Sequence, residues 1–108
     1  MAPRKRVVWL GSSKADLKAF PPAVMAAAGY QLYLVQCGLD PVDWKPMQSI
    51  GPGVREIRVR DLSGAYRVIY LAARAEALYV LSCFQKKSRK TPPAEIELAR
   101  QRLKMIPR

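Results

Sequence analysis

The stretch Gly53–Arg60 reads GVREIRVR, and it predicts the first of three consecutive strands of an antiparallel sheet, over roughly residues 54–61. The next two are predicted at residues 65–73, which begin AYRVIYL, and at residues 76–84. The segments between them, DLSG at 61–64 and ARAE at 73–76, are short enough for hairpin turns. Because Leu78–Phe84 is almost entirely apolar, the third strand is expected to be central and buried on both faces.

Cations recur at the strand period in this region. Arg58 and Arg60 are two residues apart, so they share one face of a strand, whereas Ile57 and Val59 share the other. Four more cations follow the third strand: Lys86, Lys87, Arg89 and Lys90. A sheet that presents cations in this arrangement is suited to bind phosphate groups.

The composition favours a polyanionic partner. The chain has 108 residues, and its 19 Lys and Arg against 8 Asp and Glu give a net charge of +11. The length predicts one small domain over residues 1–108. An excess of cations this large favours nucleic acid or another acidic partner, and the alternative is a solvated surface that maintains solubility.

The chain contains no histidine, which excludes Ser-His-Asp and Cys-His nucleophiles and the histidine pair of many ribonucleases. Cys37 and Cys83 lie among apolar residues and are expected to be buried, reduced thiols rather than a disulfide or a metal site. No stretch matches a secretory signal or a membrane span. A cytoplasmic protein without a membrane partner is therefore expected.

The N-terminal part predicts one strand and two helices. Arg6–Leu10 predicts a short strand, and Ser13–Asp16 matches a capping box that begins a short helix ending near Phe20. A second helix over Ala23–Cys37, stopped by Gly38, is apolar over more than one stripe. It is either sandwiched in the core or offers an apolar face to a partner.

A loop and a last helix complete the predicted fold. Residues 38–53 are rich in Gly and Pro and predict a loop anchored by Trp44, Met47 and Ile50. After Pro92 and Pro93, a final helix carries one apolar stripe: Ile96, Ala99, Leu103 and Ile106. The fold class is α+β, a small single domain in which a mainly antiparallel sheet packs against two N-terminal helices and one C-terminal helix. One α+β layer pair is expected, that is, one layer of helices packed on one layer of sheet.

Three segments, in this order and spacing, resemble the RelE/ParE superfamily of toxins, in its HigB-like, phage-associated branch. They are WKPM…GVREIR at Trp44–Arg58, AYRVIY at Ala65–Tyr70, and VLSCFQKKSRKTP at Val80–Pro92, followed by ARQR at Ala99–Arg102. The resemblance covers nearly the whole length and implies a RelE-like fold. It also implies a small cytoplasmic toxin of a type II toxin–antitoxin system. Many such toxins cleave mRNA in the ribosomal A site without a metal ion, so no metal or cofactor is expected.

Metal-free RNA cleavage sets the chemistry that the residues must perform. The 2′-hydroxyl attacks the adjacent phosphate, so the protein must accept a proton, stabilise the charge of the phosphorane and protonate the 5′-oxygen. Without histidine, proton transfer falls to Lys, Tyr, a carboxylate or ribosomal groups. A Lys crowded by Arg side chains has a lowered pKa, which makes it a candidate base.

The resemblance implies that Arg67 holds the scissile phosphate. The alternative is a structural salt bridge to Glu56 or Asp61 on the neighbouring strand. Arg58 and Arg60 are assigned to phosphate binding and transition-state charge, with a solubilising edge row as the alternative. Glu56 departs from the family pattern, because some relatives carry a catalytic Lys at this position.

The cations at the end of the third strand and in the preceding loop complete the predicted site. Related sequences place an active-site cation where Lys86 and Lys87 lie, and the spacing does not distinguish between these two. Arg89 and Lys90 are predicted to contact the ribosomal RNA backbone. Lys45 either closes over the site or is an ordinary loop lysine.

Two aromatic residues are candidates to stack a base, Phe84 and Tyr70. Tyr70 shares its strand parity with Val68 and Tyr66, which favours a core position. Phe84 is therefore the stacking candidate that is assigned to RNA binding.

The leading hypothesis is a ribosome-dependent mRNA endonuclease that acts on ribosomes with bound mRNA. A cognate antitoxin, a helix-turn-helix protein similar to HigA, would cover the Ala23–Cys37 helix or the basic sheet, and operator DNA would be bound only through it. One alternative is a ParE-like toxin that acts on DNA gyrase. Another is a phage accessory protein that binds nucleic acid without catalysis.

Overall fold

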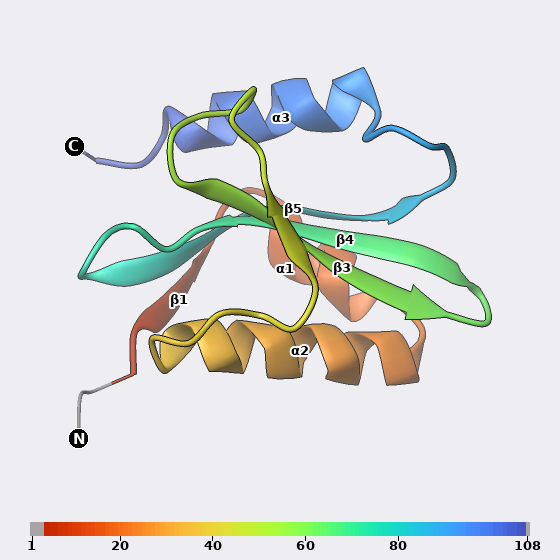
Figure 1. Ribbon diagram of the computed structural model, residues 1–108. Helices are drawn as coiled ribbons and strands as arrows, with labels where there is room; N and C mark the ends of the chain where they lie inside the picture. The colour runs from red at the N-terminus through yellow and green to blue at the C-terminus, as the bar shows by residue number, and fades with distance from the viewer. Residues whose placement is uncertain (1–3, 108) are drawn as a thin grey trace.

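A five-stranded sheet forms the middle layer of the computed structural model, which describes residues 4–107 (Figure 1). The strand order is β1-β5-β4-β3-β2, and every pairing is antiparallel except the parallel pair β1–β5. The elements in chain order are β1 Arg6–Trp9, α1 Ser13–Lys18, α2 Pro22–Gln36, β2 Trp44–Pro46, β3 Val54–Asp61, β4 Gly64–Leu71, β5 Ala77–Lys86 and α3 Pro93–Leu103. The predicted α+β fold class is confirmed.

Helices cover both faces of the sheet. Helices α1 and α2 pack on one face, over a core that includes Ile57, Val68 and Val80, and α3 packs on the other, over Ile69 and Leu81 (Figure 1). The expectation of one α+β layer pair was therefore wrong. The interior strands β4 and β5 are apolar on both faces, and a second layer is needed to remove the second face from water.

The strand predictions hold with two differences. Strand β5 is buried on both faces from Ala77 to Phe84, as predicted, but β4 occupies the middle of the sheet. The predicted loop over residues 38–53 contains the short edge strand β2, where Trp44 pairs with Ile57. Met47 and Ile50 are buried anchors as expected, whereas Trp44 is half-buried beneath the guanidinium of Arg55, 3.9 Å from the ring centroid.

The helix ends also differ slightly from the prediction. Ser13 is the first residue of α1 rather than its cap, and its buried hydroxyl donates to the carbonyl of Val80 at 3.2 Å. Helix α2 ends before Gly38, whose φ of 83° continues the chain in a left-handed conformation. None of the helices among residues 4–107 is both long and apolar enough to cross a membrane.

The two cysteines have different environments. Cys83 is buried, and burial raises the pKa of its thiol to about 12. The expectation that Cys37 is buried was wrong, because it is exposed directly after the last turn of α2.

Arg102 attaches α3 to the sheet. Its side chain is buried, and Nη1 donates to the carbonyl of Leu81 at 2.8 Å while Nη2 donates to Ser12 Oγ at 2.9 Å. Gly11 allows this approach: its φ is 54°, and a Cβ there would lie 2.6 Å from Arg102 Nε. Arg102 therefore has a structural role that its place near the C-terminal end of α3 does not reveal.

Replacing Arg102 with Met is expected to lower the free energy of unfolding by roughly 2 kcal/mol. The variant keeps most of the apolar stem but leaves the buried Leu81 carbonyl without its donor. Urea denaturation followed by circular dichroism measures the change. The control Lys104→Met removes the same charge from an exposed position at the end of α3. If both variants have the same stability, the buried hydrogen bonds of Arg102 contribute nothing.

Candidate nucleic-acid interface

One face of the sheet presents cations in adjacent cross-strand rows. Arg58 lies directly opposite Arg67, and Arg60 lies opposite Ala65, which in turn pairs with Lys86. Together with the following loop they line an open depression of about 540 Å³, and its six cations, here called the basic surface, are Arg58, Arg60, Arg67, Lys86, Lys87 and Arg89. No acidic residue lines the depression within the described part of the chain.

A β-bulge in β5 places Lys86 on the same face of the sheet as Arg67. Ile69 of β4 pairs with Ser82, but its neighbour Tyr70 pairs with Val80, so Leu81 is an extra residue. Beyond the bulge the side-chain parity reverses: Val80 packs under α2, whereas Phe84 packs on the α3 side. Lys86 follows Phe84 at strand spacing and shares its face, on the same side of the sheet as Arg67.

Arg67 is buried on the floor of the basic surface, with 5% of the residue exposed. Its Nε lies 3.3 Å from Oε1 of Glu56, and Nη1 donates to the carbonyl of Tyr66 at 3.0 Å. The structural alternative for this residue, a salt bridge to Glu56, is thus present. Burial lowers the pKa of Arg67, and the nearby charges of Arg58 and Arg60 act in the same direction. A guanidinium carries five N–H donors, so the ion pair and phosphate binding are compatible.

Arg58 and Arg60 differ in their surroundings. The Nε of Arg58 donates to Oδ1 of Asp43 at 3.0 Å, and this surface ion pair partly neutralises it. Arg60 is exposed beyond the end of β2, which pairs with β3 only at residues 55–57. Both side chains remain positioned to contact an anion in the depression.

Lys86 is the lysine whose protonation is most affected by the site. Partial burial lowers its pKa, and the charges of Arg67, Lys45 and Arg58 lower it further, while Glu56 opposes them. Lys87 lies after the end of β5 and is exposed. The structure therefore separates two lysines that the sequence left equivalent.

Of the remaining predicted residues, Arg89 belongs to the basic surface, whereas Lys90, Lys45 and Phe84 lie outside it. Arg89 lines the depression, and Lys90 is exposed just beyond it. Lys45 lies on β2, with Nζ 3.9 Å from Oε1 of Glu56, and does not line the depression. Phe84 is only 8% exposed and packs in the core, which leaves its ring little surface on which a base could stack.

Two residues that hold the site together were not among the predicted site residues. Glu56 is fully buried below the cations, and its Oε2 accepts a hydrogen bond from Thr91 Oγ1 at 2.8 Å. Glu56 and Arg58 are two residues apart on β3 and therefore share one face of the sheet. This spacing was the sequence signal that could have placed Glu56 next to the predicted site. The contact with Thr91, 35 residues later, depends on the tertiary structure.

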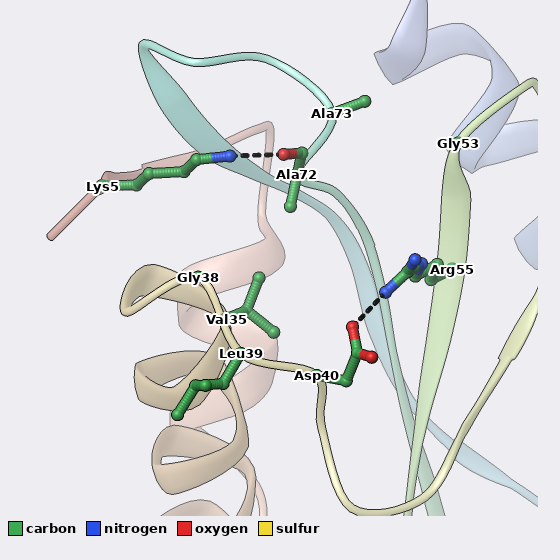
Figure 2. A pocket seen from close by; sticks show the side chains of 9 residues that line it. All are labelled: Lys5, Val35, Gly38, Leu39, Asp40, Gly53, Arg55, Ala72 and Ala73. Atoms are coloured by element: carbon green, nitrogen blue, oxygen red, sulfur yellow. Dashed lines mark hydrogen bonds and ion pairs between the residues drawn. The ribbon is translucent and has the colours of Figure 1, made fainter. Parts of the chain in front are cut away.

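A smaller cavity of about 220 Å³ lies at the opposite end of the sheet, where β3 begins and β4 ends (Figure 2). Its cations are already engaged: Arg55 donates to Asp40 at 2.9 Å, and Lys5 donates to the carbonyl of Ala72 (Figure 2). This cavity therefore offers a ligand less free positive charge than the basic surface does.

Comparison with known proteins gives one family. The model of the family described as "Phage derived protein Gp49-like (DUF891)" matches residues 15–104, which include all strands of the basic surface. No curated protein matches the chain. The chain therefore belongs to the Gp49-like family of phage-derived proteins, a RelE/HigB-like toxin family.

Proposed function

We propose that this protein is the toxin of a type II toxin–antitoxin system and acts in the cytoplasm as a ribosome-dependent, metal-free mRNA endonuclease. The observation that supports this most directly is Arg67, buried in the floor of a depression that six cations line. Such a site can bind an RNA phosphate and stabilise the additional charge of a phosphorane. The family supports the coarser part of the proposal, because it is associated with RelE-like toxins that have endoribonuclease activity.

In the proposed mechanism, Arg67 and Arg58 hold the scissile phosphate from neighbouring strands. Arg60, Lys87 and Arg89 bind adjacent phosphates, and Lys90 contacts the ribosomal RNA backbone. Lys86 has a lowered pKa and shares the face of Arg67, so its neutral form is the candidate acceptor of the 2′-hydroxyl proton. The attack forms a cyclic phosphate and releases the 5′-oxygen, which is protonated by the ribosome or solvent.

Inducible expression followed by mapping of mRNA 5′ ends tests the function. Cuts inside reading frames that disappear when translation is blocked are expected. Growth arrest with DNA breaks and intact mRNA would instead identify a gyrase-directed toxin. Absence of both arrest and cuts would leave a protein that only binds nucleic acid.

Arg67→Lys is expected to reduce mRNA cleavage by about 100-fold or more while the protein stays folded. Lysine keeps the charge beside Glu56 but loses the planar fork that binds two phosphate oxygens. Cleavage of a translated message in a cell-free system measures the effect. Arg74→Lys, in the turn between β4 and β5, is the matched control. A fully active Arg67→Lys variant would show that Arg67 has no role beyond its ion pair.

The rate of cleavage is expected to rise with pH through the pKa of Lys86. Because that pKa is lowered, the neutral lysine forms at a lower pH than in an exposed lysine. Lys86→Arg keeps the cation but does not deprotonate, so it should bind RNA and lose this rise in single-turnover rate. Lys14→Arg, on the surface of α1, is the control. If Lys86→Arg retains the wild-type pH profile, another group is the base.

The proposed antitoxin, a helix-turn-helix protein similar to HigA, docks on the outer face of α2. The antitoxin, and not the toxin, binds the operator DNA. Helix α2 contains no charged residue, and Tyr30 and Tyr33 on its outer side are 56% and 43% exposed. The guanidinium of Arg4 lies 5.5 Å from the centroid of the Tyr33 ring, but the helix face itself carries no charge. Within a chain of net charge +11, such a face is suited to bury apolar side chains of a partner.

The double variant Tyr30→Ser/Tyr33→Ser is expected to weaken antitoxin binding about tenfold or more without loss of toxicity. Exposed tyrosines contribute strongly to interfaces, and these two lie on the helical layer opposite α3 and the basic surface. Calorimetric titration with the purified antitoxin measures the affinity, and Lys18→Ser on α1 is the control. Unchanged affinity would indicate that the antitoxin binds the basic surface instead of α2.

A further inference from the structure

Glu56 is the one buried carboxylate among the eight acidic residues, all of which the structure describes. It has no exposed surface, and it lies on an interior strand beneath a strongly cationic depression. Removing an ionised carboxylate from water is costly unless partners compensate it. Its partners therefore indicate why the position carries a charge.

Three different elements supply those partners. Thr91, in the loop before α3, donates to Oε2 at 2.8 Å, while Arg67 of β4 and Lys45 of β2 lie 3.3 and 3.9 Å from Oε1. Among residues 4–107, neither Oε1 nor Arg67 Nε has a hydrogen-bond partner with suitable geometry, so their attraction is mainly that of opposite charges at short range. Glu56 of β3 thus connects β2, β4 and the loop between β5 and α3.

Arg67 needs this counter-charge. It lies directly across the sheet from Arg58, and like charges in that position repel each other. Asp43 neutralises Arg58 from the solvent side, at 3.0 Å, and Glu56 neutralises Arg67 from the protein interior. Since Glu56 is fully buried, it does not compete with a phosphate for the surface of the depression.

We propose that Glu56 is the positioning residue of the basic surface: it fixes Arg67, Lys45 and the Thr91 loop in the arrangement that receives the RNA phosphate. This inference rests on the proposed nuclease function for its catalytic consequence, and on the geometry alone for the positioning. Glu56 acts through Arg67 and does not touch the substrate.

A second consequence concerns Lys86. Its surroundings contain Lys45 on β2, Glu56 and Arg58 on β3, and Arg67 on β4, and among these Glu56 alone raises its pKa. Loss of the Glu56 charge therefore leaves only groups that lower the pKa. The pH at which Lys86 loses its proton should then decrease, which a purely structural role of Glu56 would not require.

The test uses Glu56→Gln, which keeps the size of the side chain and removes its charge. The first measurement is the ¹⁵N–¹H signal of Arg67 Nε in the full-length protein with labelled arginine. In the unaltered protein this buried N–H should exchange slowly with water, and in Glu56→Gln its signal should be lost to fast exchange. An unchanged signal would overturn the positioning role, whether or not the protein cleaves RNA.

The second measurement is the kcat, KM and pH profile of mRNA cleavage. Glu56→Gln should lower kcat by about 10- to 100-fold with little change in KM, and shift the pH midpoint downward. Glu97→Gln removes an equal charge from an exposed position on α3 and should keep wild-type values. Wild-type kcat and midpoint in Glu56→Gln would overturn the proposal.

Two further outcomes are separable. If the unaltered protein cleaves no mRNA, the proposed function fails, and the Arg67 signal still decides the role of Glu56. If Glu56→Gln does not fold, Thr91→Val removes the 2.8 Å hydrogen bond and keeps the charge. That variant must accelerate exchange of the Arg67 Nε proton, and unchanged exchange would overturn the proposal.

Discussion

The register of β3, β4 and β5, including the bulge at Leu81, is the constraint on which the rest of the structure depends. It places Arg58 opposite Arg67 and brings Lys86 onto the same face of the sheet. A shift of one residue would exchange the two faces of a strand and move cations into the apolar core under α2. The same pairing therefore determines both the hydrophobic core and the candidate site.

The fold keeps the cationic end of the sheet open and covers the rest. Helix α3 covers Ile69, Leu71 and Leu81 on one face of the sheet, and Arg102 attaches this helix to β5. The depression lies farther along the strands, at the end of β3 and β5 and the start of β4. Repulsion among the cations is offset at two positions, by Asp43 at the surface and by Glu56 in the interior. Positive charge is thus concentrated in the part of the sheet that no helix covers.

Most elements could be predicted because their signals are local. Alternating Arg and apolar residues in Gly53–Arg60 indicated a strand with two chemically distinct faces, and Gly38 marked the end of α2. Strand β2 was missed because a three-residue segment that ends in Pro46 carries almost no periodic signal, and it becomes a strand only by pairing with β3. The exposure of Cys37 was missed because apolar neighbours in sequence do not reveal which side of a helix faces the core.

The sequence by itself determined the fold class, the cationic character of β3 and of the segment after β5, and the place of Arg67 on the strand next to β3, since strand parity and composition are properties of the chain. Only the tertiary structure distinguishes Lys86 from Lys87, because a single extra residue at Leu81 reverses the parity of the rest of β5 and puts Lys86 on the face of Arg67. The sequence offered Glu56 or Asp61 as a salt-bridge partner of Arg67, and only the tertiary structure selected Glu56, buried it and added Lys45 and Thr91. Contacts between residues up to 35 positions apart arise from packing, and no local pattern encodes them.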